Sequence, residues 1–232
     1  FTGQYPGPLL EVARGSEVVV VFSNKLPDSS TVHWHGIRLD NAFDGVPELT
    51  QVAVAPGGTF TYHVRFPDAG IYWYHPHVRE DVQQELGLYG NILVGQTQKA
   101  YGPVNREEVL MLDDLLVGDS GPIPLGRESP THALMGRFGN VFLVNGEPEY
   151  RLAVRRGEVV RFYLTNASNT RTWNLSFAGA RMKVVASDAG PFEREAWVTS
   201  VVIVPAARYV VDVRCDVSGA STFVNRVQGL DH

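Results

Sequence analysis

Two stretches of this chain repeat each other at a fixed spacing, and this repeat constrains the fold more than any other feature. Arg14-Gly15, a hydrophobic run and Asn24 recur 142 residues later as Arg156-Gly157, a hydrophobic run and Asn166. Similarity at a fixed spacing is typical of chains that contain copies of one structural unit. The repeat therefore predicts two copies of the same domain.

A second pair of matching segments supports the repeat. PGGTFTYHVR at residues 56–65 matches PAARYVVDVR at residues 205–214, at a spacing of 149 residues. A chain of 232 residues can form two domains of about 100–120 residues, each with its own core. Gly102-Pro103 interrupts the pattern near the middle, so we expect one domain at residues 1–100 and another at 101–232.

Short runs of β-branched and aromatic residues recur between clusters of Gly, Pro, Asn and Asp. Such runs are typical of β-strands separated by turns. The predicted strands cover residues 17–22, 59–66, 71–74, 109–112, 141–144, 159–164, 201–204 and 209–213, and the one predicted helix is a single turn at residues 81–86. The chain is therefore predicted to be all-β, with two sandwich units.

The charge distribution argues against a nucleic-acid partner, and the hydropathy argues against a membrane-spanning helix. The formal net charge is −5, and no basic stripe is present to neutralise the phosphates of a nucleic acid. No apolar run reaches the roughly 18 residues that a membrane-spanning helix needs. We therefore expect neither a nucleic-acid partner nor a membrane span.

Four of the seven histidines form two His-X-His pairs, which are His33 with His35 and His75 with His77. Residues i and i+2 of a strand point to the same face, so each pair presents two imidazoles on one side. Two such pairs on strands of one sandwich can converge on a metal ion. Neutral imidazole suits zinc, copper, iron and nickel, and the lack of a nearby carboxylate cluster favours copper or zinc.

The other three histidines fit ordinary structural positions. His63 lies in an alternating strand pattern, His132 in a predicted loop and His232 at the end of the chain. The repeat provides an internal comparison for the pairs. At the equivalent positions the second unit has Leu175, Phe177, Val224 and Arg226. We therefore expect the metal site to belong to the first unit alone.

The order of motifs in the first unit resembles a known family. HWHG, DGVPELTQ, PGGTFTYHV, AGIYWYHPH and LGLYGNILV follow one another between residues 33 and 94. This series is similar to the first cupredoxin domain of three-domain, laccase-like multicopper oxidases. The second unit resembles the middle domain of that family through NGE, RGEVVRFYLTNAS and the segment Ala186–Gly190. The resemblance implies two tandem cupredoxin-like Greek-key β-sandwich domains.

The resemblance also implies a role for each site residue. His33 would bind the type 2 copper, His35 and His75 one copper of the type 3 pair, and His77 the other. The family's trinuclear cluster reduces dioxygen to water with electrons from a type 1 copper. Asp44 matches an acidic position that helps to deliver protons, although an Asp-Gly pair also forms turns.

Several neighbours of the histidines have less specific expected roles. Four aromatic residues are expected to pack around the site rather than to relay electrons, namely Trp34, Tyr72, Trp73 and Tyr74. Arg79, Glu80 and Asp81 are expected to support the ligand loop or to relay protons.

The resemblance leaves out part of the family's copper site. Type 1 copper needs a thiolate flanked by histidines, whereas the only cysteine, Cys215, has no histidine nearby. In the family, the type 1 ligands and the remaining cluster ligands belong to a third cupredoxin domain. We therefore expect a portion of a longer protein, incomplete at both ends, with copper ligands of types 2 and 3 only and no activity on its own.

The partners implied are dioxygen, a third cupredoxin domain and a reductant, which would be a phenol, an aromatic amine or a metal ion. The family also implies an extracellular or periplasmic location. Two alternatives remain open at this point. The missing ligands could come from another subunit, or the chain could be a non-catalytic copper- or zinc-binding cupredoxin module, since four histidines can hold one ion.

Overall fold

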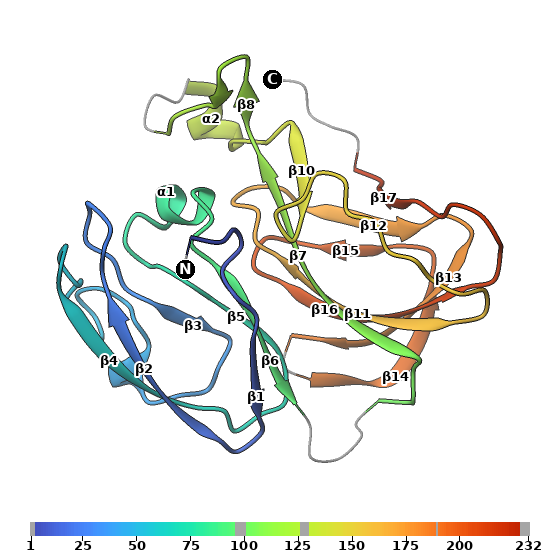
Figure 1. Ribbon diagram of the computed structural model, residues 1–232, viewed down its shortest axis with the longest axis horizontal. Coiled ribbons are helices and arrows are strands. Elements are labelled where there is room, and N and C mark those ends of the chain that lie inside the picture. Colours follow the sequence, from blue (N-terminus) through green and yellow to red (C-terminus); the bar gives the residue numbers. More distant parts are fainter. Residues whose placement is uncertain (1–2, 96–100, 126–129, 189, 228–232) are drawn as a thin grey trace. The chain divides into compact units, whose positions relative to one another are not determined.

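The computed structural model in Figure 1 describes residues 3–95, 101–125, 130–188 and 190–227. The chain divides into two compact units, unit 1 at residues 1–100 and unit 2 at residues 101–232. Within the described ranges, no helix has both the length and the apolar character that a membrane span requires.

Unit 1 consists of two facing sheets with short helical turns between strands. The larger sheet has the order β1-β6-β5-β3, in which β1 and β6 are parallel and the other neighbours antiparallel, and the smaller sheet pairs β2 with β4. The elements are β1 (Leu10–Ala13), β2 (Glu17–Ser23), β3 (His33–His35), the 3-10 turn η1 (Asn41–Phe43), β4 (Thr59–Arg65), β5 (Gly70–His75), α1 (Glu80–Glu85) and β6 (Gly90–Gly95).

The core of unit 1 forms because one face of each sheet is apolar and aromatic. Along β4, Tyr62 and Val64 are buried while their neighbours Thr61, His63 and Arg65 are exposed, as expected for a strand with one solvated face. These two side chains pack against inward-facing residues of β3, β5 and β6, namely Trp34, Tyr72, Tyr74, Ile92 and Val94. This aromatic core fixes the face of β3 and β5 that is left for the histidines.

Unit 2 has the same plan with larger sheets. Six strands have the order β10-β7-β11-β16-β13-β14, a second sheet has the order β15-β12-β17, and β8 pairs with β9. The elements are β7 (Arg106–Leu115), β8 (Val117–Gly118), β9 (Gly121–Pro122), α2 (Pro130–Met135), β10 (Val141–Val144), β11 (Val159–Asn166), β12 (Trp173–Phe177), β13 (Ala180–Ser187), β14 (Gly190–Val198), β15 (Val201–Ile203), β16 (Arg208–Cys215) and β17 (Phe223–Asn225). Figure 1 shows the long strands of the six-stranded sheet side by side.

Each unit contains the same type of hydrogen-bond network, built around one buried asparagine. In unit 1 the Asn24 side chain donates to the carbonyl of Val54 at 2.8 Å. In unit 2 the Asn166 side chain donates to the carbonyl of Ile203 at 3.0 Å. Each asparagine also accepts, at 2.9 Å, the N–H of the residue two positions later. The sequence repeat is therefore a structural repeat, with Asn24 and Asn166 tying equivalent strand ends together.

The predicted all-β, cupredoxin-like sandwich class is confirmed, and each of the eight predicted strands overlaps an observed one. The predicted turn of helix corresponds to α1, which begins at Glu80. The prediction that His132 lies in a loop is wrong, because this residue lies in α2. The short apolar run Ala133 to Met135 is too brief to give a helical period, so the sequence carried no signal for α2. His232 lies outside the described residues.

Candidate metal centre

The register between β3 and β5 brings the two His-X-His pairs together. His33 lies directly opposite His75, and His35 lies opposite Trp73. Because side chains alternate across a strand, these four side chains lie on one face of the sheet, while Trp34 and Tyr74 between them enter the core. His77 follows two residues after the end of β5, and its backbone N–H donates to the buried hydroxyl of Thr31 at 3.3 Å.

The four imidazoles form one compact cluster. His33 is the central ring, with centroids 5.6 Å from His35, 5.4 Å from His75 and 4.5 Å from His77. His75 is buried, whereas the other three rings are partly exposed. The cluster therefore has one side closed by the sheet and one side open.

Two ring nitrogens of the cluster point directly at each other. Nδ1 of His35 lies 3.3 Å from Nε2 of His75. Two nitrogens that each lie about 2.0–2.1 Å from one ion at a tetrahedral angle are about 3.3 Å apart. The separation therefore fits a shared metal ion, and three histidines, His33, His35 and His75, have ligand atoms that all lie within 4.8 Å of one another.

Polar contacts at Nδ1 leave the other nitrogen available in three of the rings. Nδ1 of His33 lies 2.7 Å from the backbone oxygen of Asp44, and Nδ1 of His75 lies 3.1 Å from that of Pro76. Nδ1 of His77 lies 3.2 Å from the carboxylate of Glu80. In each case an N–H at Nδ1 would make Nε2 the metal-binding atom.

The surroundings of His75 and His77 favour the neutral form of these two rings, which is the form that binds metals. Burial, together with the charges of the three neighbouring histidines, lowers the pKa of His75 to about 2. Burial and His33 lower the pKa of His77, while Glu80 and Asp44 act in the opposite direction. Desolvation penalises the charged imidazolium, so protons compete weakly for these nitrogens near pH 7.

The Asp44 carboxylate lies beside His33, with Oδ1 3.4 Å from Nδ1, and it is 31% exposed. Its position depends on Gly45, which has a φ of +77° and packs against β3. A Cβ at Gly45 would lie 2.0 Å from the carbonyl oxygen of Val32. The glycine therefore lets the loop approach the backbone closely enough to bring Asp44 to His33.

The aromatic residues divide into two groups. Trp34, Tyr72 and Tyr74 belong to the core cluster of unit 1. Trp73 instead stacks on His75, with ring centroids 4.1 Å apart and an interplanar angle of 20°, and also contacts His35. Trp73 therefore forms one wall of the cluster.

Three residues that follow the candidate ligand His77, which are Arg79, Glu80 and Asp81, have different partners. Glu80 contacts His77, whereas Asp81 forms a double hydrogen bond with Arg79. The contact between Glu80 and His77 has no helical sequence signal, because His77 lies in the loop before α1 and not on the helix itself. The stacking of Trp73 on His75 has the same origin as the histidine pairs, because alternation along β5 puts both rings on one face.

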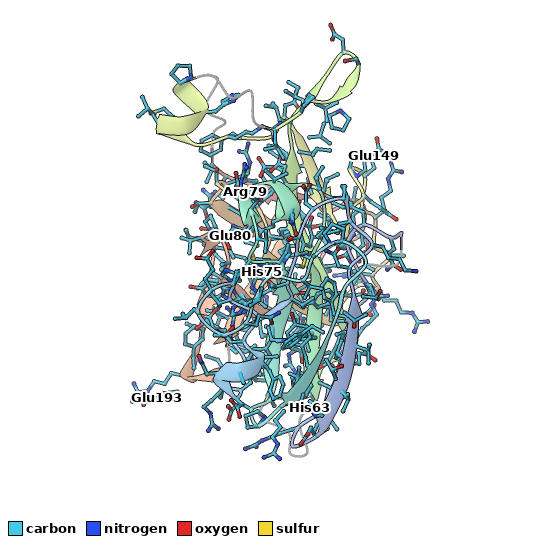
Figure 2. The ribbon with its side chains drawn as sticks, turned by 90° about the vertical axis from the view of Figure 1, so that its left-hand side faces the viewer. His63, His75, Arg79, Glu80, Glu149 and Glu193 are labelled. Atoms are coloured by element: carbon cyan, nitrogen blue, oxygen red, sulfur yellow. The ribbon has the colours of Figure 1, made fainter. Side chains whose placement is uncertain are left out.

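His63 lies apart from the cluster, and Cys215 belongs to the other unit. His63 is on the solvent side of β4, where it contacts Glu17 at 3.6 Å and Phe43. Figure 2 shows His63 far from His75, while Arg79 and Glu80 lie on the other side of His75 in that view. Cys215 ends β16 in unit 2, and burial raises the pKa of its thiol, which disfavours a thiolate ligand.

Comparisons with known proteins agree with these features. The multicopper oxidase family matches the chain twice, at residues 1–99 and 123–229. The chain is 30% identical over 214 residues to "Multicopper oxidase MmcO" of Mycobacterium tuberculosis, which covers 80% of this chain and 42% of the relative. It is 31% identical over 224 residues to "Laccase-1" of Botryotinia fuckeliana, covering 92% of this chain and 38% of the relative.

A solved structure agrees with the fold as well. The multi-copper oxidase of Pseudomonas Thermotolerans superposes with a TM-score of 0.88 at 34% identity, covering 96% of this chain and 54% of the other. The chain spans less than half the length of the two curated relatives. These similarities do not favour a non-catalytic copper or zinc module. The chain belongs to the laccase-like multicopper oxidase family.

Proposed function

We propose that this chain supplies half of the trinuclear copper site of a laccase-like oxidase. The complete enzyme would couple one-electron oxidation of phenols, aromatic amines or metal ions to the four-electron reduction of dioxygen to water. The observation that carries the proposal is the cluster of four imidazoles, in which Nδ1 of His35 and Nε2 of His75 lie 3.3 Å apart. Imidazole nitrogen is a good copper ligand, and the family supports copper over zinc.

The geometry supports a separate role for each histidine. His35 and His75 would together hold one copper of the type 3 pair, because their nitrogens face each other. His33 and His77, whose rings meet edge to face, would hold the type 2 copper and the other type 3 copper. When bound, these ions would supply the electron transfer that reduces dioxygen.

The chain's own residues would prepare the site for this chemistry. Burial keeps the pKa of His75 low, so its Nε2 stays free of protons near pH 7. Trp73 covers one side of the ring and excludes water there. Asp44 is partly exposed and touches His33, so its carboxylate would take up protons from solvent and release them on the side of the cluster.

The remaining ligands would come from outside these residues. We propose that a third cupredoxin domain supplies the other cluster histidines and the type 1 copper, because Cys215 has no histidine beside it. The 232-residue chain alone would then be inactive towards phenols. We further propose an extracellular or periplasmic location, which the family resemblance supports.

Copper analysis of the complete protein tests the proposal. About four copper ions per chain are expected after reconstitution, together with phenol oxidation that the 232-residue chain lacks. One copper ion or none in the complete protein would refute the trinuclear site. Appreciable phenol oxidation by the 232-residue chain would refute the need for a third domain.

A further inference from the structure

Glu80 contacts a candidate copper ligand through its side chain. Its Oε2 lies 3.2 Å from Nδ1 of His77, within the reach of an N–H···O hydrogen bond. The Glu80 carboxylate is 55% exposed, whereas the His77 ring is 27% exposed. The pair therefore lies at the open rim of the histidine cluster.

The helix that carries Glu80 is fixed to the loop that leads into β3. Gln83 of α1 is buried, donates to the carbonyl of Ser29 at 2.9 Å and accepts from the Ser30 hydroxyl at 2.7 Å. At the start of α1, Arg79 has a positive φ of 41° and binds Asp81 through two hydrogen bonds. The position of Glu80 is therefore set by α1, which is hydrogen-bonded to the loop before β3.

The other histidines show what such a contact does. In His33 and His75, a backbone carbonyl faces Nδ1, so the ring holds its proton there and offers Nε2. A histidine that binds a metal usually donates its second N–H to a carboxylate or a carbonyl, which fixes the tautomer and the ring orientation. At His77 a carboxylate takes the place of the carbonyl.

We propose that Glu80 is a positioning residue, whose carboxylate accepts the Nδ1–H of His77 and so presents Nε2 of that ring to the copper site. The inference rests on the proposed role of His77 as a copper ligand. A competing arrangement uses Glu80 itself as a ligand, because His75, His77 and Glu80 also have ligand atoms within 4.8 Å of one another. A separation of 3.2 Å fits both arrangements, and we choose the hydrogen bond because it leaves Nε2 of His77 for the histidine cluster, as the contacts of His33 and His75 do.

The first test uses the metal-free 232-residue chain. Long-range ¹H–¹⁵N spectra of histidine-labelled protein report which ring nitrogen carries the proton. His77 is expected as the Nδ1–H tautomer, and Glu80→Ala should shift it towards a mixture while His33 and His75 keep theirs. A His77 tautomer that is the same with and without Glu80 would overturn the proposal. The unchanged signals of His33 and His75 show that the variant is folded.

The second test measures Cu(II) binding by the same chain. Glu80→Ala should weaken the affinity by roughly 10–100-fold, the usual cost of removing a partner of a metal-binding histidine. Glu80→Gln should weaken it less, because the amide oxygen still accepts the hydrogen bond. Glu11→Gln removes an exposed carboxylate from β1 of the same unit and should change nothing.

Two results of the copper measurement would overturn the proposal. One is an affinity that does not change in Glu80→Ala. The other is a change in the g values and copper hyperfine splitting of the electron paramagnetic resonance spectrum of that variant that indicates one oxygen ligand fewer, which would make Glu80 a ligand. A chain that bound no copper would show that these four histidines need the rest of the site to hold the ion, and the tautomer comparison, which needs no metal, would still decide the role of Glu80.

Discussion

His35 and His75 face each other across neighbouring strands, with Nδ1 of one ring 3.3 Å from Nε2 of the other. The two rings sit at diagonal positions of the β3–β5 register and present different nitrogens to each other. His75 keeps its Nδ1 on the carbonyl of Pro76. The contact therefore defines a place where a single ion would bind both strands together.

Loss of either His35 or His75 should weaken metal binding between β3 and β5. His35→Ala in the 232-residue chain should lower Cu(II) affinity by more than the roughly 10–100-fold that the loss of a supporting residue costs. His63→Ala removes an imidazole from the solvent side of β4 and is the matched control. Isothermal titration with Cu(II) measures both variants, and equal affinities in the two would contradict the site.

The metal-free chain should lose stability in acid because of His75. Its pKa is about 2 in the folded chain and ordinarily 6.5, so only the unfolded chain takes up this proton as the pH falls below 6.5. The free energy of unfolding is therefore unaffected by this group above pH 6.5, and about 3 kcal/mol of it should be lost by pH 4.

Urea unfolding at both pH values measures this effect. His75→Asn should show a fall in the free energy of unfolding that is smaller by that amount, while His63→Asn should behave like the unchanged chain. If His75→Asn kept the full fall in stability, another group would be responsible for it.

Two glycines with the same φ allow the cost of backbone strain to be measured apart from the cost of a steric clash. Gly45 and Gly57 both have a φ of +77°, but a Cβ would meet the Val32 carbonyl at Gly45 and nothing within 4 Å at Gly57. Gly57→Ala should cost about 1 kcal/mol, the price of a left-handed residue with a side chain. Gly45→Ala should cost about 1–3 kcal/mol more because of the clash. Urea unfolding compares the two, and equal losses would show that the loop before Val46 can move away from β3.

Asp44 should affect turnover more than copper binding. In the complete enzyme, Asp44→Asn should lower the turnover number by about 10²–10⁴-fold, the usual contribution of a positioned acid or base. The copper content should stay the same, because the backbone carbonyl of Asp44 still holds His33. Asp28→Asn, at an exposed position of the same unit, is the control. Unchanged turnover at unchanged copper content would leave Asp44 with a turn-forming role only.

Much of the fold could be predicted because alternation and the repeat are local and regular. The equivalence of Asn24 with Asn166 in sequence became an equivalence of hydrogen bonds in the structure. One strand that was not predicted, β14, lacks such a signal. In β14, residues Gly190–Val198 are almost all exposed, and their pairing with β13 comes from tertiary contacts rather than from a hydrophobic pattern.

The candidate site could be predicted as a set of residues but not as a geometry. Two His-X-His pairs indicate that imidazoles share a face, whereas the register that sets His33 opposite His75 depends on how β3 pairs with β5. The choice of ring nitrogen depends on the carbonyls of Asp44 and Pro76, which belong to loops. These contacts arise only when the chain has folded.

The most direct test of the central claim is anomalous diffraction at the copper edge from crystals of the 232-residue chain loaded with Cu(II). The account predicts a peak between His35 and His75, about 2.0–2.1 Å from Nδ1 of the first and Nε2 of the second. A copper ion bound elsewhere, for example between His63 and Glu17, with no density between His35 and His75, would contradict it.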